Sequence, residues 1–183
     1  MSNIKIAVVI GSLRKESINR KLANALSAMA PAGFQFDLIP IAELPHYNQD
    51  EEATPTVAIV AFRGAISTAE AVLFVTPEFN RSIPGALKNA IDIGSRPYGR
   101  SVWAGKIAGV IGASPSSVAT AVAQQHLRNI LAHLDMKTMG QPEGFIQTQD
   151  GFFDGDGKIA NEGSRKFLQS WIEHYCSFVK ANS

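Results

Sequence analysis

The chain has 183 residues, of which 45% are hydrophobic and 18% are charged, a size and composition typical of one globular domain spanning residues 1–183. Its 17 basic and 16 acidic side chains leave a net charge of +1, so the broad positive surface that binds nucleic acid or an anionic membrane is missing. We therefore expect a small molecule as the partner, with no nucleic acid and no membrane.

Five apolar segments are predicted as β-strands, at residues 4–11, 34–41, 71–77, 106–114 and 135–139. The first, third and fourth lack the polar alternation of a half-exposed strand, which is typical of parallel strands buried on both faces. The first segment is too short for a membrane span or for the core of a signal peptide. We therefore expect a cytoplasmic protein.

Five helices are predicted between and after these strands, at residues 17–30, 55–70, 84–94, 117–135 and 162–180. In the last, Cys176 lies on an apolar face, and as the only cysteine it forms no internal disulfide, so we interpret it as a packing residue. Alternation of strands and helices predicts an α/β fold in which helices cover both faces of a parallel sheet. Ligands of such folds bind at the carboxyl ends of strands, here after the first, third and fourth.

The loop after the first strand, GSLRKESIN, matches neither the glycine pattern of dinucleotide-binding folds nor the P-loop pattern. It combines a glycine with polar groups at a helix N-terminus, namely Gly11, Ser12, Arg14, Ser17 and Asn19. Unpaired N–H groups at a helix end and a guanidinium stabilise a phosphate. The loop is interpreted as a site for a terminal phosphate. The alternative is that Ser17 only caps the helix and Arg14 is solvated.

The loop after the third strand lies within TPEFNRSIPGALKNAID and is longer than a minimal connection. Pro77 and Pro84 fix the backbone at its two ends, so the N–H groups of Glu78, Phe79 and Asn80 are expected to face the edge of a flat ring. A third polar loop, GASPSS at residues 112–117, follows the fourth strand. The three loops together predict one pocket.

The segments GSLRKESINRKL, TPEFNRSIPGALKNAID and GASP resemble the three signature loops of the NADPH-dependent FMN reductase family, which has a flavodoxin-like fold and includes quinone and chromate reductases. The resemblance runs from residue 4 to about residue 145. It implies a three-layer α/β/α sandwich with a five-stranded parallel sheet of order 2-1-3-4-5. It also implies FMN as cofactor and NADPH or NADH as hydride donor.

Carried over residue by residue, the resemblance implies that the FMN site consists of Gly11, Ser12, Arg14, Ser17, Ile18, Asn19, Pro77, Glu78, Phe79, Asn80, Ile83 and Ser114. The residues of the first loop would hold the phosphate, and residues 77–80 would lie along the isoalloxazine through backbone N–H groups. Phe79 stands where relatives often carry tyrosine, so one hydroxyl is lost. No side chain is assigned a catalytic role, because a flavin carries out hydride chemistry itself.

The implied activity is hydride transfer from NAD(P)H to FMN and then electron transfer to a quinone, chromate or azo compound by a ping-pong mechanism. The alternative is a flavodoxin-type one-electron carrier, which the missing acidic face disfavours. Arg96 and Arg100 are interpreted as solvated charges or subunit contacts, or else as cations that reach an anionic substrate across a dimer. A homodimer or homotetramer is expected, and the spacing of the histidines predicts no metal site.

Overall fold

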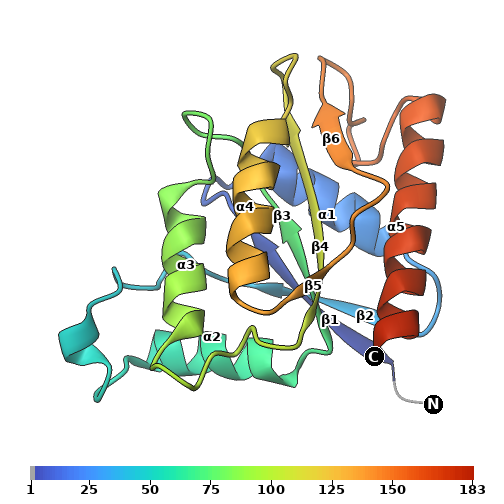
Figure 1. Ribbon diagram of the computed structural model, residues 1–183. Coiled ribbons are helices and arrows are strands. Elements are labelled where there is room, and N and C mark those ends of the chain that lie inside the picture. The colour runs from blue at the N-terminus through green and yellow to red at the C-terminus, as the bar shows by residue number, and fades with distance from the viewer. Residues whose placement is uncertain (1–2) are drawn as a thin grey trace.

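The computed structural model describes residues 3–183 and shows a parallel sheet between two layers of helices (Figure 1). The strands are β1 (Ile4–Ile10), β2 (Phe34–Ile39), β3 (Ala71–Val75), β4 (Ile107–Ser114), β5 (Lys137–Thr138) and β6 (Gly144–Gln147). Their order is β2-β1-β3-β4-β5, and β6 also pairs with β4. The expected α/β class and strand order are confirmed.

The prediction of five strands is wrong at one edge of the sheet. β5 pairs with the start of β4, and β6 pairs with its end, so two short strands share the edge position. Gly140 and Pro142 lie between them. Proline has no N–H for a ladder hydrogen bond and glycine weakens a strand, which explains the interruption. The sixth strand was missed because Phe145 and Ile146 alone are too few to mark a strand.

All five expected helices are present: α1 (Ile18–Met29), α2 (Val57–Thr68), α3 (Gly85–Ser95), α4 (Ala121–His133) and α5 (Glu162–Asn182). The fourth begins later than expected, because residues 117–120 form a turn. A short 3-10 helix, η1 (Gln49–Glu51), lies in the long loop between β2 and α2. That loop extends along one side of the molecule in Figure 1.

Side chains of β1 show how the sheet is covered on both faces. Ile6, Val8 and Ile10 pack in the apolar cluster that includes residues of α1 and α5. Ala7 and Val9 pack in the opposite cluster, with residues of α2, α3 and α4. All five are buried, as expected for a strand without polar alternation.

The last helix contributes to the core through its cysteine. Cys176 is 1% exposed, and burial raises the pKa of its thiol to about 12. A thiol with such a pKa is a poor nucleophile at neutral pH, so its interpretation as a packing residue is confirmed. Neither α5 nor any other helix within residues 3–183 has an apolar stretch long enough to cross a membrane.

Candidate functional site

The predicted loops leave the sheet at adjacent points, because three strands stay paired up to their carboxyl ends. The N–H of Gly11 donates to the carbonyl of Val75 at 2.9 Å, and the N–H of Thr76 donates to the carbonyl of Ile111 at 3.0 Å. A Cβ atom at Gly112 would overlap the carbonyl oxygen of Thr76, so only glycine permits this approach of β4 to β3. The loops after β1, β3 and β4 therefore meet at one edge.

The loop between β1 and α1 carries a run of unpaired backbone donors. From Ser12 through Asn19, no N–H group donates to an acceptor within residues 3–183. α1 begins at Ile18, and its N-cap residue Ser17 accepts a hydrogen bond from the N–H of Arg20 at 3.4 Å. Ser17 therefore caps α1, and its hydroxyl hydrogen stays available for a second partner. Free N–H groups and the positive end of a helix dipole form a setting that stabilises an anion.

The side chains of this loop differ in their surroundings. Ser12 and Ser17 are buried, whereas Arg14 is exposed. Asn19 is also buried, and its amide bonds to β4: Nδ2 donates to the carbonyl of Ala113 and Oδ1 accepts from the N–H of Ala113, both at 2.9 Å. These two bonds use half of the hydrogen-bonding capacity of the amide and hold α1 against β4, which leaves the second Nδ2–H of Asn19 as the part of the amide that could serve a phosphate.

The loop between β3 and α3 contains a two-residue hairpin. The N–H of Phe79 donates to the carbonyl of Ser82 at 2.9 Å, and the N–H of Ser82 donates back to the carbonyl of Phe79 at 3.0 Å. At the tip, Asn80 has φ 51° and Arg81 has φ 64°, as in a type I′ turn. The expectation of a free N–H at Phe79 is therefore wrong. The backbone N–H groups of Glu78 and Asn80, in contrast, have no acceptor in the described part of the chain.

Glu78 links this loop to α4. Its Oε2 accepts hydrogen bonds from the N–H groups of Val122 and Ala123, each at 3.0 Å. The N-cap residue of α4, Thr120, makes no side-chain cap hydrogen bond, so Glu78 supplies the cap instead. Oε1 of Glu78 lies 3.4 Å from Nη1 of Arg81, and the side chain of Glu78 is 9% exposed. No local pattern indicates this contact, because it joins residues 44 positions apart.

The remaining expected site residues lie at the same edge. Phe79 is 53% exposed, whereas Ile83 is 8% exposed and packs in the core against the α2, α3 and α4 side of the sheet. Pro77 lies between β3 and the hairpin and is half-buried. The hydroxyl of Ser114 accepts a hydrogen bond from the N–H of Ser116 at 3.2 Å, so it is already engaged within its own loop.

Arg96 and Arg100 lie at the other end of α3. This helix starts beside the hairpin loop and has 11 residues, which separates its ends by about 16 Å. Nε of Arg96 donates to the hydroxyl of Tyr47 at 2.8 Å and to Oε1 of Glu52 at 2.9 Å. Arg96 is therefore not a freely solvated charge. Within one chain, the structure does not bring either arginine to the three loops.

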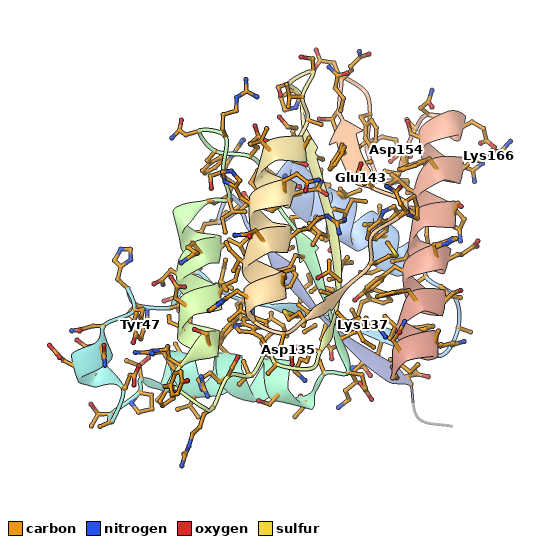
Figure 2. The ribbon with its side chains drawn as sticks, viewed as in Figure 1. Tyr47, Asp135, Lys137, Glu143, Asp154 and Lys166 are labelled. Atoms are coloured by element: carbon orange, nitrogen blue, oxygen red, sulfur yellow. The ribbon has the colours of Figure 1, made fainter. Side chains whose placement is uncertain are left out.

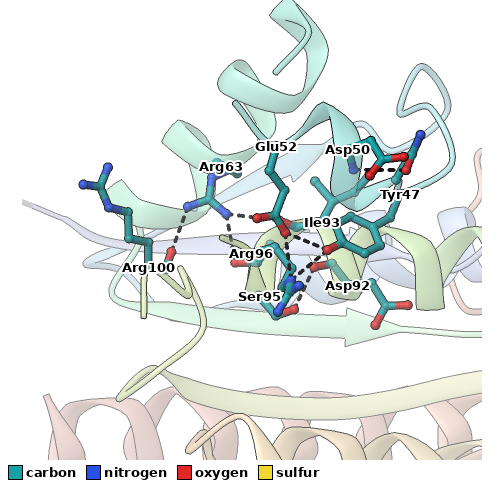
Figure 3. A network of polar contacts seen from close by, with 11 residues as sticks. Tyr47, Asp50, Glu52, Arg63, Asp92, Ile93, Ser95, Arg96 and Arg100 are labelled. Carbon is teal, nitrogen blue, oxygen red and sulfur yellow. Dashed lines mark hydrogen bonds and ion pairs between the residues drawn. The ribbon is translucent and has the colours of Figure 1, made fainter. Parts of the chain in front are cut away.

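The contacts of Arg96 belong to a polar network between α3 and the η1 loop (Figure 3). The hydroxyl of Tyr47 donates to Oε1 of Glu52 at 2.6 Å, and Tyr47 lies beside α3 in Figure 2. This hydrogen bond, together with the guanidinium of Arg96, holds the pKa of Glu52 below its ordinary value. Nη2 of Arg63 donates to the carbonyl of Arg100 at 2.8 Å. The network anchors the η1 loop and lies outside the candidate site.

The comparisons with known proteins assign the family. The sequence profile of the NADPH-dependent FMN reductases matches residues 4–150. The chain belongs to the NADPH-dependent FMN reductase family. This family member is 46% identical over 177 residues to 2-hydroxy-1,4-benzoquinone reductase of Burkholderia sp, with 97% of each chain covered. It is 49% identical over 178 residues to a quinone reductase of Pseudomonas putida, covering 97% of this chain and 95% of that relative.

Solved structures agree with this assignment of the FMN reductase fold. FerB, a flavoenzyme NAD(P)H:(acceptor) oxidoreductase from Paracoccus denitrificans, superposes with a TM-score of 0.93 at 40% identity, covering 97% of this chain and 98% of that chain. A flavodoxin from Pseudomonas aeruginosa superposes with a TM-score of 0.58 at 19% identity, covering 97% of this chain and 98% of that chain. The flavodoxin likeness concerns the fold alone.

The residues of this FMN reductase family member fit the cofactor of the family. FMN carries an anionic phosphate and a flat ring with a polar edge. Unpaired N–H groups between Ser12 and Asn19 suit the phosphate, and those of Glu78 and Asn80 suit the ring edge. Both sets lie at one edge of the sheet. Within residues 3–183, no group of three or more histidine, cysteine or acidic side chains is placed to hold a metal ion.

Proposed function

We propose that this single-domain protein is an NAD(P)H-dependent oxidoreductase that uses FMN to reduce quinones. The observation that carries the proposal is the run of free N–H groups from Ser12 to Asn19, beside the hairpin loop at the same sheet edge. The family gives FMN as the cofactor and NAD(P)H as the donor. Relatives named as quinone reductases support a small quinone as the acceptor.

Each loop has a distinct part in this proposal. The N–H groups of the first loop and the hydroxyls of Ser12 and Ser17 hold the phosphate, with Arg14 available from the solvent side. The N–H groups of Glu78 and Asn80 meet the polar edge of the ring. Phe79, which is 53% exposed, offers an apolar surface at the mouth of the site. Pro77, Ile83 and Ser114 complete the surroundings.

When bound, FMN supplies the redox chemistry by accepting a hydride from NADPH or NADH and passing electrons to the acceptor. The chain's own task is to bind, orient and stabilise. Backbone N–H donors fixed at the ring edge stabilise negative charge without reorganisation. Because the carboxylate of Glu78 is engaged with α4, it is not a free acid or base. Donor and acceptor use the same face, which predicts ping-pong kinetics.

The proposal extends to chromate and azo compounds as further acceptors, to a cytoplasmic location and to a homodimer or homotetramer. Three apolar side chains in the segments next to the ends of α3 and α4 stay exposed: Tyr98 at 92%, Phe79 at 53% and Val118 at 38%. A second copy of the chain would cover them. A route from Arg96 or Arg100 to a substrate would require this second copy.

Spectroscopy of the purified protein tests the proposal. After addition of FMN and removal of free cofactor, flavin absorption bands are expected to stay with the protein. They should bleach on anaerobic addition of NADPH or NADH and return when benzoquinone is added. Steady-state rates at varied NADPH and quinone should give parallel double-reciprocal lines. Retained flavin that neither nucleotide reduces would favour the one-electron carrier, and failure to bind FMN would reject both functions.

A further inference from the structure

We propose that Glu78 is a positioning residue whose carboxylate holds the hairpin loop against α4, so that the free N–H groups of Glu78 and Asn80 stay where the ring of FMN binds. The inference rests on the FMN site of the proposed function. It adds a role for the Glu78 side chain, whereas the family resemblance implies only backbone contacts at this position. The role differs from acid–base catalysis, because the side chain acts through the loop.

The contacts place α4 behind the loop at two points. Before the hairpin, Oε2 of Glu78 accepts from Val122 and Ala123 at 3.0 Å each. After the hairpin, the hydroxyl of Ser82 lies 3.1 Å from Nδ1 of His126, one turn further along the same helix. The hairpin therefore begins and ends on α4. Loss of the first point leaves, as the polar contact between the hairpin and α4, the exposed one between Ser82 and His126.

The first turn of α4 has no substitute for this carboxylate. The hydroxyl of Thr120, the residue in the N-cap position, accepts a hydrogen bond from Nε2 of Gln124 at 2.8 Å instead of capping the helix. Without Glu78, the N–H groups of Val122 and Ala123 would lose their acceptor, and an unpaired donor of this kind costs free energy. The negative charge also interacts favourably with the positive end of the helix dipole.

The backbone conformation of the hairpin explains why the contact between Glu78 and α4 should affect the shape of the loop. Asn80 and Arg81 both have positive φ values, a conformation that asparagine adopts readily but that arginine holds only when its surroundings require it. The direction of the Asn80 N–H is set by these backbone angles, so it is kept only as long as the hairpin keeps its shape. A loop released from α4 is expected to relax toward ordinary backbone angles, and the donors for the ring edge would then lose their common position.

The competing explanation is that Glu78 only stabilises α4, with no effect on the loop. Three substitutions separate the two explanations. Glu78→Ala removes the acceptor, Glu78→Asp keeps the charge but shortens the side chain, and Glu78→Gln keeps an acceptor oxygen at full length. Thr56→Ala is the matched control, because Thr56 caps α2 through the N–H of Ile59 and lies outside the candidate site.

The first measurement is the dissociation constant for FMN. It is obtained from the quenching of flavin fluorescence when FMN-free protein is titrated into FMN. Glu78→Ala and Glu78→Asp are expected to raise it roughly 5–150-fold, the usual range for coupled sites. Glu78→Gln should stay closer to the wild type, and Thr56→Ala should lower the melting temperature without changing the dissociation constant. A wild-type protein that fails to bind FMN would instead overturn the proposed function.

The second measurement is amide hydrogen exchange of the FMN-free protein. In Glu78→Asp, faster exchange is expected both at Val122 and Ala123 and at the hydrogen-bonded N–H groups of Phe79 and Ser82. The proposal is overturned if only the α4 amides respond, or if Glu78→Asp and Glu78→Gln both bind FMN like the wild type. These two variants decide the matter even if Glu78→Ala does not fold.

Discussion

The side-chain amide of Asn19 forms two hydrogen bonds with the backbone of Ala113, one donated and one accepted, both at 2.9 Å. Asn19 lies in the first turn of α1 and Ala113 near the end of β4. One buried amide thus fixes the start of α1, and with it the loop between β1 and α1, relative to the loop after β4. It supplies partners for two backbone groups that water does not reach.

Replacement of Asn19 by alanine is expected to weaken both the fold and FMN binding. The N–H and carbonyl of Ala113 would be left unpaired, which costs about 1–3 kcal/mol for each buried group. We expect a lower free energy of unfolding in urea and weaker FMN binding by fluorescence titration. The two effects share one cause, because the start of α1 loses its attachment to β4.

Asn89 offers a matched control for this prediction. Its amide also makes two backbone hydrogen bonds, accepting from the N–H of Tyr47 and donating to the carbonyl of Pro45, both at 2.8 Å. It lies on α3, on the side that faces the η1 loop. Asn89→Ala should therefore lower stability and leave FMN affinity unchanged. Equal loss of FMN affinity in both variants would show that Asn19 has no particular connection to the site.

The thiol of Cys176 is expected to resist alkylation in the folded protein. It is 1% exposed and burial raises its pKa to about 12, so both access and the thiolate form are lacking at pH 8. Iodoacetamide followed by mass spectrometry should show no adduct in native buffer and one adduct in urea. Rapid labelling of the native protein would contradict the packing role of Cys176.

Glu52 is expected to make stability depend on pH. Its hydrogen bond from Tyr47 and the nearby Arg96 lower its pKa from the ordinary value of 4.5 in the folded state. A lowered folded pKa stabilises the fold at pH values above the ordinary pKa, and this contribution is lost as pH falls through the folded pKa. The stability difference between wild type and Glu52→Gln should therefore shrink as pH falls below about 4.5.

Urea unfolding at a series of pH values measures this difference. Tyr47→Phe removes the largest cause of the shift, so it should reduce the pH dependence while leaving the Arg96 contact with Glu52. A stability difference between wild type and Glu52→Gln that stays constant from pH 7 to pH 3 would refute the assignment.

Most of the fold follows from local sequence patterns, and its exceptions have physical causes. The apolar run of β1 indicates burial on both faces, and Ile6 and Ala7 do face opposite clusters. The strand expected at residues 135–139 is present as the shorter β5, but β6 was not predictable, because it is held by pairing with the end of β4 rather than by its own composition. Strand propensity is a weak predictor where pairing and packing with neighbouring strands determine whether a segment forms a strand.

Within the site, loop positions were predictable and partners were not. Gly11 and the polar residues after β1 indicate an anion site by composition and position alone. The partner of Asn19 is 94 positions away, and the partners of Glu78 are 44 and 45 positions away, on α4. The N–H of Phe79 donates within its own hairpin. This hairpin depends on the left-handed backbone of residues 80 and 81, and the pair Asn-Arg at its tip is not one of the residue pairs that predict such a turn.

Arg81→Gly is expected to stabilise the protein, because Arg81 adopts a left-handed backbone with φ 64° at the second position of the hairpin tip. A residue with a side chain pays about 1–2 kcal/mol for this conformation, and glycine after asparagine is the preferred pair for a type I′ turn. The side chain of Arg81 is 67% exposed and lies 3.4 Å from Glu78, so loss of this exposed ion pair costs little.

Arg81→Ala separates the two contributions, since it removes the charge and keeps the strain. Thermal unfolding should give a higher melting temperature for Arg81→Gly than for wild type and no gain for Arg81→Ala. If alanine stabilises as much as glycine, the strain lies in the arginine side chain and not in the hairpin backbone.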